Sequence, residues 1–370
     1  MRLLKLTYIN HRTGWNIKDL LFGNLSLLVG ASGVGKTQIL KAILELCKVA
    51  HGKSLNGVAW ELEFEEDSCV YTWSGEYEES QEEEDFLFGE KSRNSISREI
   101  LIEKETKKII FRREGSKLLY NDEPTVKLDP TESAIELLKE EPKIAPIREA
   151  FRKVILLDMD KTGGIRIRPS LWDIEKTGLS LHDIKRLRSY NPFDRLYLIK
   201  KNKPEKFMEI QNTFHNVFTL VELIDFDLHR LGENSFVPTL KIKEDKVDHW
   251  IDQLNISNGM LRTLAQIITL ALAEDGDVIL IDEFENGLGV NCIEDLAEMA
   301  VEPEVNVQII MTSHHPYIIN AIPYKDWRIV SRRGSNVCVN TAAELGIGEG
   351  SKHKAFMQLV QTTEYTTGQS

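Results

Sequence analysis

Eight residues near the start of the chain have the types and the spacing of a phosphate-binding loop. Residues 30–37 read Gly-Ala-Ser-Gly-Val-Gly-Lys-Thr, the glycine, lysine and threonine pattern of a P-loop, between an apolar run and a helical pattern. Glycines let backbone N–H groups turn inward around phosphate oxygens, and the helix N-terminus adds partial positive charge. The sequence therefore predicts a nucleoside triphosphate site, contacted by Gly30, Ala31, Ser32, Gly33, Val34, Gly35, Lys36, Thr37 and Gln38.

Two acids follow an apolar run late in the chain. Residues 277–283 read Asp-Val-Ile-Leu-Ile-Asp-Glu, which predicts a buried strand that ends in Asp282 and Glu283. A carboxylate at such a strand end can order Mg²⁺ and its water beside the phosphates, and a second one can polarise the attacking water. Residues 154–160, Val-Ile-Leu-Leu-Asp-Met-Asp, have the same outline and are the alternative pair of acids.

Two further motifs flank these acids. Residues 257–259, Ser-Asn-Gly, open a helical pattern, where the serine suits an N-cap and the glycine lets backbone approach an anion closely. The apolar run 307–311 ends in Thr-Ser-His-His-Pro, and His314 could sense a γ-phosphate by donating an N–H. Each motif is common when taken singly. A zinc site at His314 and His315 is disfavoured because no third ligand lies nearby in the sequence.

The elements that must position these residues follow from the hydrophobic pattern. The first part is predicted to contain strands at 2–8 and 25–30, a helix at 36–50 and an antiparallel meander over about 58–120. Residues 131–230 favour short helices separated by prolines, and a strand is predicted near 236–242. The last part alternates between helices and strands, which is typical of a parallel sheet: helices 259–274, 290–300 and 316–321, and strands 277–282, 306–312 and 326–330.

Composition restricts the classes of protein to consider. Hydrophobic residues make up 42% and charged residues 28%, as in ordinary globular proteins, and no apolar run approaches the roughly 20 residues that span a bilayer. The apolar core of the N-terminal segment is too short for a secretory signal, and four isolated cysteines suit a reducing compartment. A cytoplasmic protein without membrane contact is therefore predicted. The net charge of −12 argues against a globally basic nucleic-acid face, but scattered arginine clusters leave nucleic acid open as a partner.

The order of these motifs resembles that of the ABC-type ATPase superfamily. Within it, the chain is similar to the predicted ATPases related to the overcoming-lysogenization-defect proteins and to SMC- and RecF-type heads. Residues 281–288, Ile-Asp-Glu-Phe-Glu-Asn-Gly-Leu, are similar to the family's D-E-P-E-N-G-L-H, and residues 312–317 are similar to T-T-H-S-P-Y. The resemblance covers most of the chain and is strongest at 25–50 and 250–330.

The resemblance implies an α/β fold, that of an ABC-type P-loop ATPase head that binds ATP and Mg²⁺. We expect a mostly parallel core sheet flanked by helices, an N-terminal antiparallel β meander and a helical lobe. Residues 1–130 and 235–345 would together form the ATPase core, 131–234 an inserted helical lobe and 346–370 a C-terminal tail.

The same resemblance implies a role for each motif residue. Lys36 would bind phosphate, Thr37 and Asp282 would hold Mg²⁺ and its water, Glu283 would be the general base and His314 the switch histidine. Ser257, Asn258 and Gly259 fall in the signature motif, which in this superfamily completes the site across a head-to-tail dimer. A homodimer, or a higher oligomer built from dimers, is therefore expected. The chain departs from the family pattern at Phe284, where proline is usual, at residues 289–290, Gly-Val in place of His-Pro, and at His315, where serine is usual.

Three functions remain in competition. A transporter motor is the least favoured, because the signature motif follows the P-loop by many more residues than in a compact transporter motor. A DNA repair or recombination ATPase that clamps DNA is an alternative, although the heptads of a long coiled coil are absent. The favoured function is an ATPase of a bacterial anti-phage defence system. Overcoming-lysogenization-defect relatives carry a nuclease domain after the ATPase, and only residues 331–370 follow the last predicted strand here, so a separately encoded nuclease or toxin is the expected effector.

Overall fold

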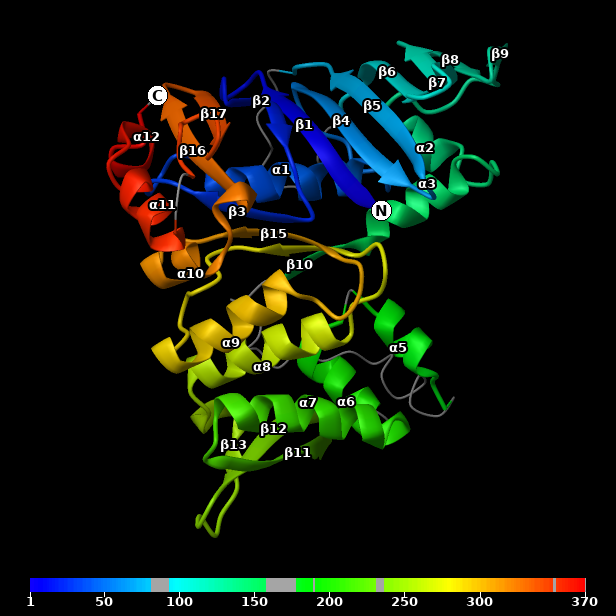
Figure 1. The fold of residues 1–370 in the computed structure, drawn as a ribbon. Coiled ribbons are helices and arrows are strands. Elements are labelled where there is room, and N and C mark those ends of the chain that lie inside the picture. The colour runs from blue at the N-terminus through cyan, green and yellow to red at the C-terminus, as the bar shows by residue number, and fades with distance from the viewer. Residues whose placement is uncertain (81–92, 158–177, 189, 231–235, 349–350, 370) are drawn as a thin grey trace.

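The computed structural model describes residues 1–80, 93–157, 178–188, 190–230, 236–348 and 351–369. These residues form a large sheet of 14 strands with helices on its faces, and a smaller body of helices and a three-stranded sheet lies below it in Figure 1. The strand order of the large sheet is β10-β14-β15-β3-β16-β17-β2-β1-β4-β5-β6-β7-β8-β9. This is the α/β architecture expected from the sequence, with the P-loop strand β3 inside the sheet.

One part of the sheet is parallel and the other is antiparallel. The parallel strands are β10 (Val154–Leu157), β14 (Val278–Ile281), β15 (Gln308–Thr312), β3 (Leu25–Val29) and β16 (Trp327–Arg333). The antiparallel meander contains β2 (Asn16–Leu21), β1 (Arg2–Asn10), β4 (Val58–Glu66), β5 (Cys69–Tyr77), β6 (Ile96–Glu103), β7 (Lys108–Glu114), β8 (Lys117–Tyr120) and β9 (Glu123–Pro124). The hairpin partner of β16, β17 (Asn336–Thr341), joins the two parts by pairing with β2. The predicted parallel core and N-terminal meander are both confirmed.

The core strands are mostly apolar because both faces of the parallel sheet are covered. On β3, Leu27 and Val29 belong to the hydrophobic cluster that includes residues of α8 (Asn258–Ala271), α9 (Val290–Val301) and α10 (Pro316–Ala321). Leu28, which points to the opposite face, belongs to the cluster formed with α1 (Lys36–Val49) and the meander. Each side of the site is therefore anchored in a separate core.

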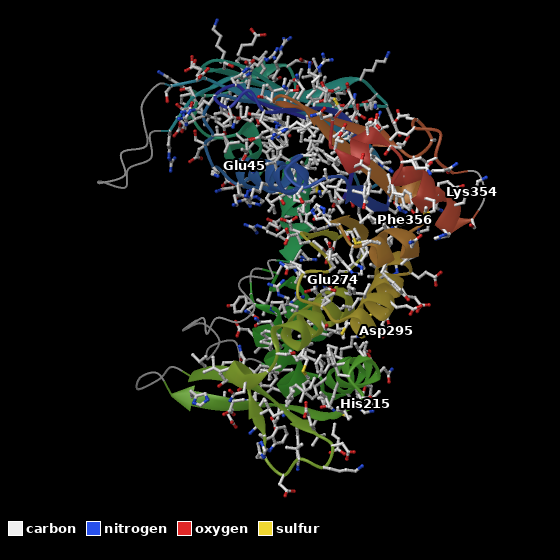
Figure 2. All side chains as sticks on the ribbon, turned by 90° about the vertical axis from the view of Figure 1, so that its left-hand side faces the viewer. Glu45, His215, Glu274, Asp295, Lys354 and Phe356 are labelled. Atoms are coloured by element: carbon white, nitrogen blue, oxygen red, sulfur yellow. The ribbon has the colours of Figure 1, made fainter. Side chains whose placement is uncertain are left out.

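The smaller body packs beneath α8. It contains α6 (Pro192–Asn202) and α7 (Pro204–Val217) and the sheet of β11 (Val221–Arg230), β12 (Phe236–Glu244) and β13 (Ile251–Asp252). Figure 2 shows its position, with His215 of α7 in the lower body and Glu45 of α1 in the upper one. The prediction of helices throughout 131–230 is wrong at β10 and at β11, where alternating apolar residues pair with β12.

Short helices complete the described fold. They are α2 (Ala134–Leu137), α3 (Ala145–Ala150), α5 (Leu181–Arg186), α11 (Lys352–Leu359) and α12 (Thr363–Thr366). The division of the chain into core, lobe and tail stays a prediction, and β10, from within 131–234, is an edge strand of the core sheet. The alternative acids, Asp158 and Asp160, lie outside the described residues, and so does one of the arginine clusters, that of Arg166 and Arg168. None of the helices in the described ranges combines the length and apolar character that crossing a bilayer requires.

Candidate nucleotide-binding site

The P-loop leaves the sheet beside β16, and two of its glycines are required by that path. Gly30 has a φ of +148°, and a Cβ atom built on it would lie 2.2 Å from the carbonyl oxygen of Val330. Gly35 has a φ of +109° and faces the Trp15 ring, to which a Cβ would approach within 3.3 Å. Both positions have φ values that residues with a side chain rarely adopt, so the path of the loop requires glycine there.

Lys36 is held inside the loop by the loop's own backbone. Its ammonium donates to the carbonyl oxygens of Gly30 and Ala31, each at 2.8 Å, and the residue is 6% exposed. Burial lowers the pKa of Lys36 to about 8, against the opposing influence of the nearby carboxylates of Glu285, Asp282 and Glu283. A phosphate arriving in the loop would give this buried cation the counter-charge that its present partners lack.

The two acids that end β14 are joined to the P-loop through hydroxyl groups. The Thr37 hydroxyl donates to Asp282 Oδ1 at 3.1 Å, and the Thr312 hydroxyl donates to the same oxygen at 2.8 Å. Thr312 also accepts the backbone N–H of Glu283 at 2.7 Å, so this buried threonine aligns both acids. A hydroxyl beside a carboxylate fits Mg²⁺, which commonly takes one or two protein oxygens and completes its shell with phosphates and water.

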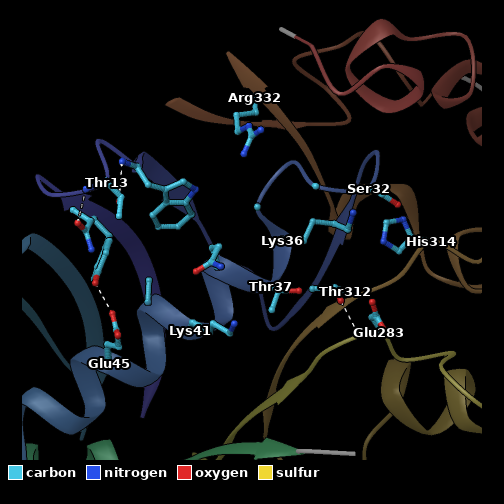
Figure 3. Close-up of a pocket in the computed structure, with 17 residues that line it drawn as sticks. Thr13, Ser32, Lys36, Thr37, Lys41, Glu45, Glu283, Thr312, His314 and Arg332 are labelled. Atoms are coloured by element: carbon cyan, nitrogen blue, oxygen red, sulfur yellow. Dashed lines mark hydrogen bonds between the residues drawn. The ribbon is translucent and has the colours of Figure 1, made fainter. Parts of the chain in front are cut away.

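Glu283 occupies an unusual backbone conformation at the rim of the site. Its φ is +48°, in the left-handed region that non-glycine residues rarely enter. Its side chain is exposed and accepts a hydrogen bond from Asn286 Nδ2 at 3.0 Å through Oε2. Figure 3 shows Glu283 next to Thr312 at the edge of the pocket. The carboxylate is therefore held at the wall of the pocket.

His314 follows the end of β15 and is held by Glu285. Glu285 Oε1 accepts the backbone N–H of His314 at 2.6 Å, and its other oxygen is buried without a hydrogen-bond partner in the described chain. Burial, with the Lys36 charge adding to it, lowers the pKa of His314 below its ordinary value. The imidazole is therefore neutral near pH 7 and can donate one ring N–H into the pocket, which it lines.

These residues line one open pocket of about 570 Å³. The structure brings together Lys36, Thr37, Glu283 and His314 there, with Asp282 bonded to Thr37 behind them. The remaining wall contains residues that the sequence analysis did not identify: Tyr8, Asn10, Thr13, Trp15, Lys41, Ala42, Glu45, Thr312 and Arg332. Trp15 and Arg332 come from distant segments that meet the loop only through sheet pairing, and no local pattern indicates this.

The predicted signature residues lie on the surface, outside this pocket. Ser257 is the N-cap of α8, its hydroxyl accepts the N–H of Met260 at 3.2 Å, and both Ser257 and Asn258 are exposed. A Cβ atom on Gly259 would lie 2.5 Å from the carbonyl oxygen of Gly287. Close packing of α8 on the loop after Glu283 therefore gives Gly259 a structural role within one chain.

The loop after the acids is fastened to α8. Gln266 Nε2 donates to the carbonyl oxygen of Phe284 at 3.2 Å, and Arg262 donates to that of Asn286 at 2.8 Å. Phe284 is buried, and its N–H donates to the carbonyl oxygen of Thr312 at 3.0 Å. Proline, the usual residue at this position, could not make this last bond. The departure at Phe284 thus adds a link between the loop and β15.

A family model covers most of the chain. The family described as "AAA domain, putative AbiEii toxin, Type IV TA system" matches residues 25–320. The chain belongs to this family. The matched region of this AAA-domain P-loop ATPase starts at β3 and includes the P-loop, both acids and the strand that leads to His314.

Solved SMC heads are similar to this AAA-domain ATPase in fold. The structure of the SMC head bound to the C-terminal winged-helix domain of ScpA aligns with a TM-score of 0.50 and 14% identity, covering 92% of this chain and 97% of that one. The SMC head domain from Thermotoga maritima aligns with a TM-score of 0.41 and 13% identity, covering 92% and 99%. Among curated proteins, none matches the sequence. The first of these alignments shows a fold similar to that of an SMC-type ATPase head, and the finer resemblance to overcoming-lysogenization-defect and RecF relatives stays a prediction.

Proposed function

We propose that this protein binds ATP with Mg²⁺ in the described pocket and hydrolyses it to ADP and phosphate. The observation that carries the proposal is the network in which Thr312 bonds Asp282 and Glu283 while Thr37 of the P-loop bonds the same Asp282 oxygen. Elements far apart in the sequence thereby bring the P-loop, Glu283 and the bonded pair of Thr37 and Asp282 together at one cavity. Such an arrangement supports phosphoryl transfer to water.

Each residue has a step in the proposed reaction. Lys36 exchanges the carbonyl oxygens of Gly30 and Ala31 for β- and γ-phosphate oxygens. Thr37 and Asp282 would hold Mg²⁺, which would supply positive charge to neutralise those oxygens. Glu283 accepts a hydrogen bond from a water, orients it in line with the γ-phosphorus and takes its proton. His314 donates its ring N–H to the γ-phosphate and so distinguishes ATP from ADP.

We propose that two copies close head to tail on two nucleotides. Ser257, Asn258 and Gly259 lie at the N-terminal end of α8 but do not line their own pocket. The exposed start of this 14-residue helix carries partial positive charge, which suits the γ-phosphate held by a second copy. Higher oligomers would be built from this dimer.

The cellular role we propose is nucleotide-dependent control of a separately encoded nuclease or toxin in bacterial anti-phage defence, in the cytoplasm. The description of the family, which names a toxin of a type IV toxin–antitoxin system, supports a defence role. A RecF- or SMC-like ATPase that clamps DNA is the second candidate, and the head fold shared with the SMC protein favours it. Fold similarity alone does not decide between them.

A comparison of three variants tests the proposal. Lys36→Ala removes the phosphate-binding cation and should abolish ATP binding, whereas Lys48→Ala, an exposed lysine at the far end of α1, should bind like wild type. Glu283→Gln should bind ATP, hydrolyse it slowly and accumulate closed dimers, because the base is lost while the phosphate site remains. Wild-type hydrolysis by Glu283→Gln would show that Glu283 is not the base and would return attention to Asp158 and Asp160.

The cellular role needs its own experiment. Tagged Glu283→Gln is purified from its native source with ATP and Mg²⁺, and co-purifying protein and nucleic acid are identified, with Lys36→Ala as the control. A stoichiometric nuclease-like or toxin-like partner that Lys36→Ala does not retain would support effector control. Duplex DNA with repair factors would favour the clamp, and metal-dependent nuclease activity of the purified chain alone would contradict a separate effector.

A further inference from the structure

The segment of residues 363–369 lies directly against the P-loop. It contains α12 and the short stretch of chain after it, and Figure 1 shows α12 beside β16 at the edge of the molecule near the C-terminus. The last pair between β16 and β3 joins Ile329 to Val29, where β3 gives way to the P-loop. Beyond that point the N–H of Arg332 donates to the carbonyl oxygen of Gly368 at 2.7 Å. Residues 363–369 therefore lie beside the end of β16, beyond the point where β3 stops pairing with it and the chain turns into the P-loop.

Gly368 lies close against the loop. Its φ is +70°, and a Cβ atom built on it would lie 2.5 Å from Val34 Cγ1 and 3.1 Å from Ala31 Cβ. Both neighbours are P-loop residues, and Val34 is 5% exposed. Any side chain at position 368 would therefore push the segment off the loop or push the loop out of place.

The same segment also touches the other side of the site. Tyr365 packs against the core cluster that contains α10, and burial, with the Glu285 carboxylate adding to it, raises the pKa of its phenol. Glu285 is the residue that holds the backbone N–H of His314. The preceding helix, α11, packs on α10, which begins two residues after His314. One C-terminal segment therefore spans the P-loop and the switch histidine.

We propose that residues 363–369 form a brace that positions the P-loop for nucleotide, with Gly368 as the positioning residue. The brace covers Val34 but leaves Ser32 and Gly33 exposed, so it supports the loop from the side and keeps its tip open to ATP and to a second head. A loop held in its binding conformation loses less entropy when phosphate arrives, and its affinity is higher for that reason. By linkage, ATP strengthens the contact between brace and loop by the same factor.

The first readout of the test is independent of nucleotide. Gly368→Val should increase amide hydrogen exchange across residues 31–35 in the nucleotide-free protein, because the new side chain meets Val34. The matched control is Gly346→Val. Gly346 has a φ of +67°, and a Cβ atom placed on it would meet no atom within 4 Å, so this variant carries the same backbone strain without the contact. Unchanged P-loop exchange in Gly368→Val would overturn the brace.

The second readout is affinity for a non-hydrolysable ATP analogue with Mg²⁺. Gly368→Val should raise its Kd roughly tenfold, and Gly346→Val should not. If Gly368→Val folds poorly, a chain that ends after Thr362 provides a second variant, because it removes the brace without inserting a side chain. This truncated chain should show the same loss of affinity. If Gly368→Val and the truncated chain bound the analogue as tightly as wild type, the proposed effect of the brace on nucleotide affinity would be wrong. The inference rests on the proposed function, but failure of wild type to bind the analogue would contradict that function alone, since the exchange experiment still tests the brace.

Discussion

Thr312 connects the groups on which the proposed chemistry depends. Its hydroxyl donates to Asp282 and accepts from the N–H of Glu283, and it is buried between β14 and the P-loop strand. The bond to the N–H of Glu283 also helps to hold that residue at its positive φ. At the scale of single residues, this side chain therefore fixes the geometry of both acids.

Replacing Thr312 with valine preserves the branched shape and removes both hydrogen bonds. We expect Thr312→Val to lower kcat roughly 10- to 100-fold, the usual effect of removing a partner of a metal-site ligand. ATP affinity should change less, because Lys36 and the loop backbone remain. Steady-state hydrolysis and analogue titration would measure the two effects, and Thr312→Ser, which restores the hydroxyl, should recover most of the turnover. Wild-type kcat in Thr312→Val would contradict the role of the network.

The lowered pKa of Lys36 predicts a pH dependence of ATP binding. With a pKa of about 8 in the free protein, Lys36 is protonated below this pH and loses its charge above it. Bound phosphates would raise that pKa again, so binding above pH 8 must take up a proton. Affinity should therefore be nearly constant below pH 8 and fall by about tenfold for each further pH unit. Calorimetry in buffers of different ionisation enthalpy should detect the proton uptake, and pH-independent binding without it would contradict this assignment.

At the scale of elements, α8 determines the position of the loop that carries Glu283. Gln266 and Arg262 donate to its carbonyl groups, and Gly259 lets the start of the helix touch Gly287. The helix start thus has two separable tasks: one is packing on its own chain, and the other is the proposed contact with a second head. Substitutions at neighbouring positions should separate them.

Gly259→Ala should lower the stability of the fold alone, whereas Ser257→Ala should also lower ATP-dependent dimerisation. The methyl group of Gly259→Ala meets the carbonyl oxygen of Gly287, so we expect a loss of stability of about 1–3 kcal/mol by overpacking. Ser257→Ala loses the N-cap bond to Met260, which costs about 1 kcal/mol. Ser257→Ala should in addition weaken ATP-dependent dimerisation. Denaturant unfolding and light scattering with Glu283→Gln as background would measure these effects, and unaltered dimerisation would contradict the signature role of Ser257.

Much of the site and of the core could be predicted because its signals are local. The run 25–29, the loop after it and the helix at 36–49 form one strand–loop–helix unit, and the strand at 278–281 is marked by its apolar run and terminal acids. Other features depend on long-range pairing. Trp15 and Arg332 reach the pocket only because β17 pairs with β2 and β16 pairs with β3. In β11, apolar and charged residues alternate, which is typical of a strand. The helical patterns around it led to the prediction of a helix there instead.

At the scale of the whole molecule, an ion-pair cluster joins the smaller body to the core sheet. Arg188, between α5 and α6, donates to Asp277 Oδ1 at 3.0 and 2.6 Å and to Glu274 at 3.0 Å. Asp277 directly precedes β14 and is fully buried, and burial raises its pKa although Arg188 opposes the shift. The strand that ends in the two acids is therefore tied at its other end to the helical body.

Arg188→Met should destabilise the protein by about 3–5 kcal/mol, because it leaves a buried carboxylate without its partner. The pKa of Asp277 would then rise further, so acidification should protonate this group at a higher pH than in wild type and recover part of the lost stability. In wild type, where Arg188 opposes the rise in this pKa, the gain should be smaller and should come at lower pH. Urea unfolding at neutral and mildly acidic pH would measure the difference. The double variant Arg188→Met/Asp277→Asn, which removes the charge, should be less destabilised than Arg188→Met at neutral pH, and equal stability of the two would contradict the explanation.

The place of β3 in the sheet has a consequence for how the protein is made. Its two hydrogen-bonded neighbours, β15 and β16, are formed by residues 308–312 and 327–333. On the ribosome, the strand Leu25–Val29, which is fully buried in the folded protein, therefore emerges long before either neighbour exists, and until then it is unpaired and prone to aggregation. A prematurely terminated translation product would have a P-loop sequence but no nucleotide site. A nucleotide site assembled in this order can form only when synthesis has passed residue 333.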